Sequence, residues 1–214
     1  GCSVLLERPP ATTLDELALL AQRAKAGGLT LYTAWHSRHA PMVEAARAWL
    51  AGRVVSAGQV SWLEDVRRWH PGQRWLWQAG GLGVFDPGIN AFSILTTILP
   101  LAPRVERATL EVPANAHTPI AARLALAAGD ARIDVNLDFL QSGPQVWEIV
   151  LDTACGHRLQ LSEGGARLAI DAGPARSFAG AFRAPVEAQF LRGQSRRGGR
   201  LQLVHRVGPP FPTQ

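Results

Sequence analysis

The chain has 214 residues, of which 47% are hydrophobic and 18% charged, and it contains two cysteines. The ordinary apolar fraction excludes a chain that is disordered over most of its length, and no apolar run approaches the ~20 residues of a membrane-spanning helix. Two cysteines cannot build a disulfide scaffold, so we expect a protein of the reducing cytoplasm.

The net charge of +5 comes from the C-terminal end of the chain. Five arginines and no acidic residue follow Leu191, and the rest of the chain is balanced, with 17 basic and 17 acidic residues. The arginines in the run 195–200 could contact RNA or a phosphate. A solvated terminal turn is favoured, because the basicity is confined to this segment. We therefore expect residues 193–214 to form a basic tail, and we expect no nucleic-acid partner.

The first third of the sequence alternates predicted strands and helices. Residues 4–6 predict a buried strand. Thr13 and Glu16 form a capping box at the start of a helix, which Gly27 ends. The elements predicted next are a strand at 29–36, a helix at 42–50 that Pro41 begins, and a strand at 54–62.

The stretch 64–90 is a loop broken by prolines and glycines, and a buried helix follows it. Four of the seven tryptophans lie in or beside this loop: Trp62, Trp69, Trp75 and Trp77. Apolar residues after Asp86 recur at helical spacing and predict a helix that reaches Leu99.

The second half of the sequence predicts strand after strand. The expected strands are 104–112, 119–127, 131–140, 145–153, 157–162 and 166–171. Short turns between consecutive strands favour antiparallel pairing. We therefore predict an α/β (α+β) fold with a large, mostly antiparallel open sheet and helices on one face. Residues 185–191 predict one last helix.

Asp86 and Asn90 are the first candidates for chemistry. They are four residues apart at the start of a predicted helix and so share one face, where the helix dipole favours a carboxylate anion. In a cleft, Asp86 could accept a proton from a substrate hydroxyl that Asn90 orients. On these two residues alone, a helix cap and a surface amide are the favoured alternative.

The tryptophan-rich loop adds Glu64, His70 and Trp69 to these candidates. Aromatic faces together with carboxylate, amide and imidazole groups are typical of sugar sites. Core packing is the alternative for at least half of the tryptophans, and a loop histidine with satisfied hydrogen bonds is an equal alternative for His70.

Other motifs support neither a metal site nor a nucleotide site. Gly81-x-Gly83-x-x-Asp86 lacks the last glycine of a dinucleotide-binding loop and follows no convincing strand. His36, His39, Cys155 and His157 have no convergent metal-ligand spacing, so we expect no metal. The sequence has no nucleophile elbow and no Walker loop, and neither cysteine has the flanks of a known nucleophile motif.

Four segments together resemble one enzyme family. They are Glu7-Arg8-Pro9, residues 35–41 (Trp-His-Ser-Arg-His-Ala-Pro), residues 69–73 (Trp-His-Pro-Gly-Gln) and residues 80–90 (Gly-Gly-Leu-Gly-Val-Phe-Asp-Pro-Gly-Ile-Asn). Through them the chain resembles the Gfo/Idh/MocA oxidoreductases over essentially all of residues 1–192. Within that family it looks most like the D-galactose and L-arabinose 1-dehydrogenases, and the stretch 62–92 is the most specific part.

The resemblance implies an N-terminal Rossmann domain that binds NAD or NADP, followed by an α/β domain whose open sheet is often used for oligomer contacts. It assigns residues 1–36 to the last strand-helix part of the Rossmann domain and residues 37–192 to the substrate-binding domain. The glycine-rich cofactor loop is then expected upstream of Gly1. The expected partners are an aldose substrate and a second copy of the chain, bound through the sheet face, with no membrane partner.

The resemblance also implies roles for single residues. Asp86 matches the acidic residue of a Gly-Gly-x-x-x-Asp motif, and Asn90 stands where many relatives have a histidine acid/base, so Asp86 is the expected proton acceptor. Glu64 and His70 match positions that contact sugar hydroxyls, and Trp69 lies beside them. The residues expected near the nicotinamide are Glu7, Arg8, Pro9, His36 and Arg38.

Arg8 departs from the family pattern, because the motif has lysine there. Arginine stays charged, so it could hold an oxyanion or a carboxamide but cannot accept a proton. Lys25, the single lysine, lies on a predicted helix and is not expected to substitute. The expected function is a sugar 1-dehydrogenase that converts an aldopyranose and NAD(P)+ to an aldonolactone and NAD(P)H. The alternatives are a non-catalytic sugar-sensing relative and an oligomerisation fragment.

Overall fold

The computed structural model of the chain describes residues 1–11, 13–177 and 201–203. These residues form two compact units. Unit 1 contains residues up to His36 together with 201–203, and unit 2 contains residues from Ser37 to 177. The helix predicted at 185–191 and the arginine run at 195–200 lie outside the described residues.

Unit 1 is a small parallel sheet with one helix. Strand β1 (Ser3–Glu7) lies between β2 (Leu31–Ala34) and β11 (Leu201–Leu203), and both neighbours pair with it in parallel. The predicted capping box starts α1 (Leu14–Ala26): the Thr13 hydroxyl accepts from the Glu16 amide at 3.2 Å, and the Glu16 carboxylate accepts from the Thr13 amide. Strand β11 falls inside the segment predicted as a tail, so these three residues are part of a sheet instead.

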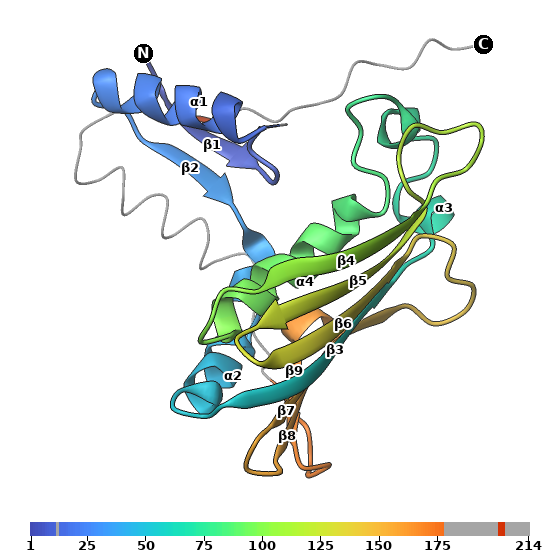
Figure 1. The fold of residues 1–214 in the computed structure, drawn as a ribbon. Helices are drawn as coiled ribbons and strands as arrows, with labels where there is room; N and C mark the ends of the chain where they lie inside the picture. The colour runs from blue at the N-terminus through green and yellow to red at the C-terminus, as the bar shows by residue number, and fades with distance from the viewer. Residues whose placement is uncertain (12, 178–200, 204–214) are drawn as a thin grey trace. The chain divides into compact units, whose positions relative to one another are not determined.

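Unit 2 is built on one eight-stranded sheet, with the order β10-β9-β8-β7-β3-β6-β5-β4 (Figure 1). Strands β3 and β6 pair in parallel, and the other neighbours are antiparallel. The strands are β3 (Val55–Leu63), β4 (Arg104–Glu111), β5 (Ala121–Ala128), β6 (Ala131–Asp138), β7 (Val146–Thr153), β8 (Arg158–Ser162), β9 (Arg167–Ile170) and β10 (Arg176–Ser177). The predicted fold class is confirmed.

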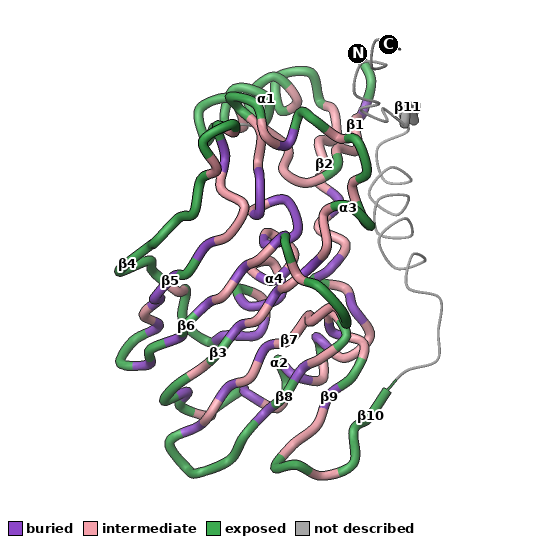
Figure 2. The backbone as a smooth tube through the Cα atoms, turned by 90° about the vertical axis from the view of Figure 1, so that its right-hand side faces the viewer, coloured by how far each residue is buried: buried purple, intermediate pink, exposed green. Residues whose placement is uncertain are grey.

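Helices α2 (Val43–Leu50) and α4 (Phe85–Ile98) pack on one face of this sheet (Figure 1). The inward side chains of β6 are buried while the intervening ones are exposed or half-buried, and Figure 2 shows this alternation. Ile94 and Leu95 of α4 are fully buried against this core. A Cβ atom on Gly88 would lie 2.6 Å from Cδ1 of Leu137, so glycine there allows α4 to approach β6 closely.

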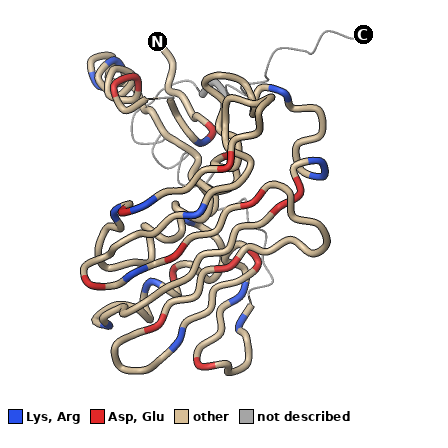
Figure 3. The backbone as a smooth tube through the Cα atoms, turned by 45° about the vertical axis from the view of Figure 1, so that its right-hand side comes forward, with Lys and Arg blue, Asp and Glu red and all other residues tan. Residues whose placement is uncertain are grey.

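The other face of the sheet is polar. Basic and acidic residues both occur along the strands of the sheet (Figure 3). On this face Arg132 forms an ion pair with Asp134. Every residue of the edge strand β4 is exposed.

Short helices occupy segments that the sequence predicted as loop or strand. The strand predicted at 29–36 ends at Ala34, and η1 (His36–His39) follows as a 3-10 helix. Inside the tryptophan-rich stretch lie α3 (Val66–Trp69) and η2 (Arg74–Trp77), and η3 (Glu163–Gly165) joins β8 to β9. No helix within the described ranges has the length and apolarity that crossing a membrane requires.

Candidate active site

The start of α4 presents Asp86 and Asn90 on one helix face. Asp86 is only 6% exposed, and Asn90 is half-buried one turn later. The N-cap of α4 is Val84, so Asp86 lies in the first turn and the helix-cap alternative is wrong. Its carboxylate instead lies beside an imidazole, since Oδ2 is 3.4 Å from Nε2 of His70. The positive end of the helix dipole lies at this first turn, where it attracts negatively charged groups.

The glycine run before α4 allows the backbone to turn into the helix. Gly83 has a φ of +52°, and a Cβ atom there would lie 2.3 Å from the carbonyl oxygen of Pro119. That same carbonyl accepts a hydrogen bond from the amide of Val84 at 2.7 Å. Glycine is therefore required where the chain passes Pro119 and turns into the helix that carries Asp86.

His70 has a defined hydrogen-bonding direction. Its Nδ1 lies 3.2 Å from Oε1 of Gln73, and this oxygen also accepts from the indole N–H of Trp75. Because an amide oxygen only accepts, Nδ1 carries a proton, which leaves Nε2 to face Asp86. Nε2 donates to Asp86 when the ring carries both protons and accepts from a hydroxyl when it carries one. The ring also packs against Phe139, 5.7 Å between centroids.

Glu64 follows the end of β3 and is only 8% exposed. Its Oε1 accepts two indole hydrogen bonds, from Trp62 at 3.1 Å and from Trp147 at 2.8 Å. Burial raises the pKa of Glu64; the two indole donors and His70 oppose the rise, and Asp86 adds to it. His70 and Asp86 both act on the Glu64 carboxyl, and they lie 3.4 Å from each other, so the three side chains form one cluster.

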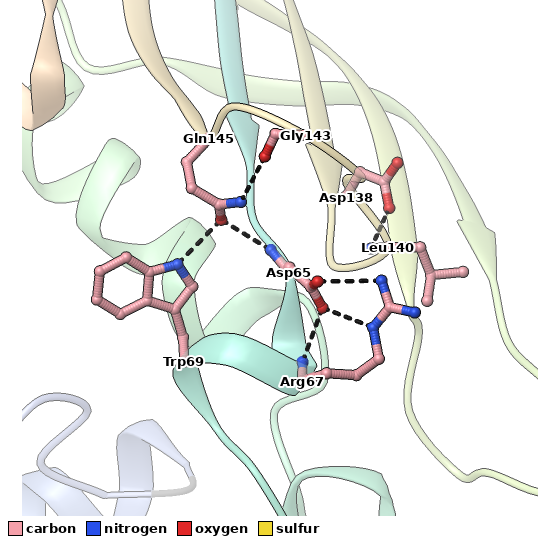
Figure 4. A network of polar contacts seen from close by, with 7 residues as sticks. All are labelled: Asp65, Arg67, Trp69, Asp138, Leu140, Gly143 and Gln145. Carbon is pink, nitrogen blue, oxygen red and sulfur yellow. Dashed lines mark hydrogen bonds and ion pairs between the residues drawn. The ribbon is translucent and has the colours of Figure 1, made fainter.

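Trp69 lies at the edge of this cluster and is 43% exposed. Its indole N–H donates to Oε1 of Gln145 at 2.9 Å, and the same oxygen accepts from the backbone amide of Asp65 (Figure 4). The ring packs 5.6 Å from that of Trp147, and the Arg68 guanidinium lies 5.4 Å from its centroid. Gln145 therefore fixes Trp69 in place while part of the indole stays accessible.

The structure brings together Glu64, His70 and Asp86, with Asn90 on the same face of α4 as Asp86. Four further residues form hydrogen bonds with the candidate site residues and were not predicted from the sequence. Trp147 and Gln145 lie on the β7 side, Gln73 orients His70, and Ser37 donates from Oγ to Oδ1 of Asn90 at 3.0 Å. Gln73 and Ser37 lie inside the family-like segments 69–73 and 35–41, but those segments assign them no role, and Trp147 and Gln145 lie in no motif. Each of the four acts through a hydrogen bond to another side chain, which a sequence pattern does not reveal.

The residues expected near a nicotinamide lie mostly in unit 1. Glu7 ends β1 and pairs with Ala34 near the end of β2; Arg8 and Pro9 follow β1, and His36 follows β2. All therefore lie at the carboxyl ends of parallel strands, where α/β sheets bind their ligands. Arg38 belongs to η1 in unit 2.

Within the part of the chain that the structure describes, no three or more His, Cys, Asp or Glu side chains are grouped so that they could hold a metal ion. Cys2 and Cys155 are both exposed free thiols.

The titration of Glu64 predicts how one substitution changes stability with pH. Because its pKa is raised in the folded state, the stabilising contribution of Glu64 is full below the unfolded pKa and is lost as the pH rises through the raised value. Glu64→Gln keeps an oxygen for the two indoles and does not titrate. We expect the melting temperature of E64Q, relative to that of the unsubstituted protein at the same pH, to increase as the pH rises above the ordinary glutamate pKa of about 4.3.

Differential scanning fluorimetry at a series of pH values without sugar measures this difference. Glu106→Gln on the exposed strand β4 is the matched control. The prediction would be contradicted if the difference in melting temperature between E64Q and the unsubstituted protein did not change with pH, or if E106Q showed the same change.

Comparison with known proteins finds sugar dehydrogenases. The chain is 47% identical to galactose 1-dehydrogenase of Pseudomonas fluorescens over 174 residues, which are 80% of this chain and 55% of that protein. It thus spans about half the length of this curated relative. The crystal structure of D-galactose-1-dehydrogenase from Rhizobium etli matches 94% of the chain at a TM-score of 0.76 and 42% identity, and 70% of that structure is covered.

A third match supports the fold alone. An inositol dehydrogenase homologue from Azotobacter vinelandii, complexed with NADH and myo-inositol, matches 82% of this chain and 49% of that one, with a TM-score of 0.66 at 18% identity. No family model matches the chain.

Proposed function

The chain belongs to the Gfo/Idh/MocA oxidoreductase family, and from this membership we propose that it supplies the substrate-binding domain of a sugar 1-dehydrogenase. The substrate class is an aldopyranose such as galactose or arabinose, and the product is the aldonolactone. The observation that carries the proposal is the cluster at the start of α4, where buried Asp86 faces Nε2 of His70 and Asn90 lies one turn away.

Asp86 is the proposed proton acceptor. The C1–H bond breaks with its electron pair leaving as hydride, the C1 hydroxyl proton passes to the Asp86 carboxylate, and the C1–O bond becomes a double bond. A nicotinamide cofactor, NAD or NADP, supplies the hydride acceptor when bound. A desolvated carboxylate suits this task because little water competes for the proton.

The proposed nicotinamide site uses the residues at the carboxyl ends of β1 and β2. The residues that would hold the cofactor there are Glu7, Arg8, Pro9 and His36, and their position fits that role because parallel strands bind ligands at this edge. Arg38 of η1 is a separate proposed contact to the cofactor.

Glu64, His70 and Trp69 are the proposed sugar-binding residues. Both indole bonds go to Oε1 of Glu64, so Oε2 is the oxygen that would accept from a sugar hydroxyl. His70 offers Nε2, and the accessible part of Trp69 offers an apolar surface for the C–H groups of a ring.

We further propose that two copies of the chain form a homodimer through the polar sheet face, and that the protein is located in the cytoplasm. The face carries charges of both signs, as in the pair Arg132 and Asp134, and such a surface can pair with a second copy of itself. The free thiols of Cys2 and Cys155 are compatible with a reducing compartment.

Arg8 favours a second candidate, a sugar-binding relative without catalysis. A permanently charged guanidinium cannot accept a proton, and it is bulkier than the lysine of the family motif. Such a protein would keep the cluster around Asp86 and would not turn over sugar.

The test combines turnover and binding in the complete protein. We expect D-galactose or L-arabinose to drive reduction of NAD+ or NADP+, followed by absorbance, and to raise the melting temperature, because a ligand that binds only the folded state stabilises it. A melting shift without turnover would support the sensor. Neither turnover nor a melting shift with any aldose would overturn both candidates and leave the oligomerisation fragment.

A further inference from the structure

Asn90 is held by a hydroxyl group that the proposed reaction does not use. Ser37 lies in η1, is 7% exposed, and donates from Oγ to Oδ1 of Asn90 at 3.0 Å. The two residues are 53 positions apart in the sequence, so this bond links η1 to the middle of α4 within unit 2.

The bond decides which end of the Asn90 amide faces a ligand. An amide side chain has one oxygen that accepts and one NH2 group that donates. Ser37 occupies the oxygen, and among the residues that the structure describes no group accepts a hydrogen bond from Nδ2. Ser93 donates to the backbone carbonyl of Asn90 and leaves the amide untouched. The helix face therefore offers an acceptor at Asp86 and a donor at Asn90.

We propose that Ser37 is a positioning residue, which holds the Asn90 amide so that Nδ2 donates to the same substrate oxygen whose proton Asp86 accepts. This inference rests on the proposed function. A hydroxyl group donates through its O–H to one partner while its oxygen accepts from another, and the oxygen gains negative charge as the proton leaves. A donor that is already in place stabilises this charge without reorganisation. Without Ser37 the amide is free to turn and present its oxygen, which repels the substrate oxygen.

Ser37→Ala tests the inference in the complete protein. We expect kcat to fall about 3- to 10-fold, the value of one hydrogen bond between neutral groups, while KM for the sugar changes less. Ser93→Ala is the matched control, because it also removes a half-buried hydroxyl bonded to Asn90, and it should leave kcat unchanged.

A double-mutant cycle separates positioning from a structural role. If Ser37 acts through the amide, Ser37→Ala has no further effect on kcat in an Asn90→Ala background. The inference is overturned if S37A has the kcat of the unsubstituted protein while N90A has a reduced kcat. It is also overturned if Ser37→Ala lowers kcat by the same factor in the Asn90 and Asn90→Ala backgrounds. Normal turnover by N90A would instead overturn the proposed role of Asn90 itself, and the inference with it. If S37A unfolds at a temperature too low for the assay, Ser37→Cys takes its place in the same double-mutant cycle. Cysteine has a similar size, and its thiol is only a weak donor, so kcat should again fall in the Asn90 background and not in the Asn90→Ala background.

Discussion

Asp86→Asn is expected to lower kcat for the aldose by about 10²–10⁴-fold, because removing a true acid/base group typically has an effect of this size. The amide keeps the shape of the carboxylate but cannot take the C1 hydroxyl proton. It also replaces the carboxylate group whose Oδ2 lies 3.4 Å from Nε2 of His70. Sugar binding, measured as a sugar-dependent rise in melting temperature, should be retained within a few-fold, because the amide still accepts from a hydroxyl.

Asp130→Asn is the control for this experiment. Asp130 is exposed in the turn between β5 and β6, so the same chemical change there should leave kcat unchanged. If D86N turned over sugar at a near-normal rate while folding normally, Asp86 would not be the proton acceptor. A protein that binds sugar equally well with and without Asp86, and reduces no cofactor in either form, would point to the sensor.

Local patterns predicted the elements of the fold well. The capping box at Thr13 and Glu16 is present, and the strands predicted from β-branched and aromatic residues occur within a few residues of their expected ends. The order of the strands could not be predicted from the sequence. Strand β3 pairs in parallel with β6 and antiparallel with β7, and both partners lie far from it along the chain. Such pairing depends on packing of the buried faces rather than on local propensity.

The site shows the same division between local and distant signals. Helical spacing placed Asp86 and Asn90 on one face, and the composition of the tryptophan-rich loop, which added Glu64 and His70, made all four candidates for a sugar site. The partners that orient them were not predicted, since Trp147 is 83 positions from Glu64 and Ser37 is 53 from Asn90. An isolated tryptophan on a strand or serine in a short helix gives no sign of the group it will bond.

The glycines before α4 provide the second large effect, this time on stability. Gly80 and Gly83 both have positive φ, at +82° and +52°. A Cβ atom on Gly80 meets nothing within 4 Å, whereas one on Gly83 would lie 2.3 Å from the carbonyl of Pro119. Gly80→Ala therefore has only the conformational cost of a left-handed residue, about 1 kcal/mol. Gly83→Ala adds a backbone clash, for about 3 kcal/mol or more in all.

The difference in melting temperature between G80A and G83A measures the effect of the backbone clash. At about 2–4 °C per kcal/mol for a chain of this size, we expect G80A to melt about 3 °C lower and G83A about 10 °C lower than the unsubstituted protein. The amide of Asp86 donates to the carbonyl of Gly83, so relief of the clash moves the first turn of α4 and should also reduce kcat in G83A. Equal melting temperatures for the two variants would show that the turn relaxes freely and does not fix where Asp86 stands.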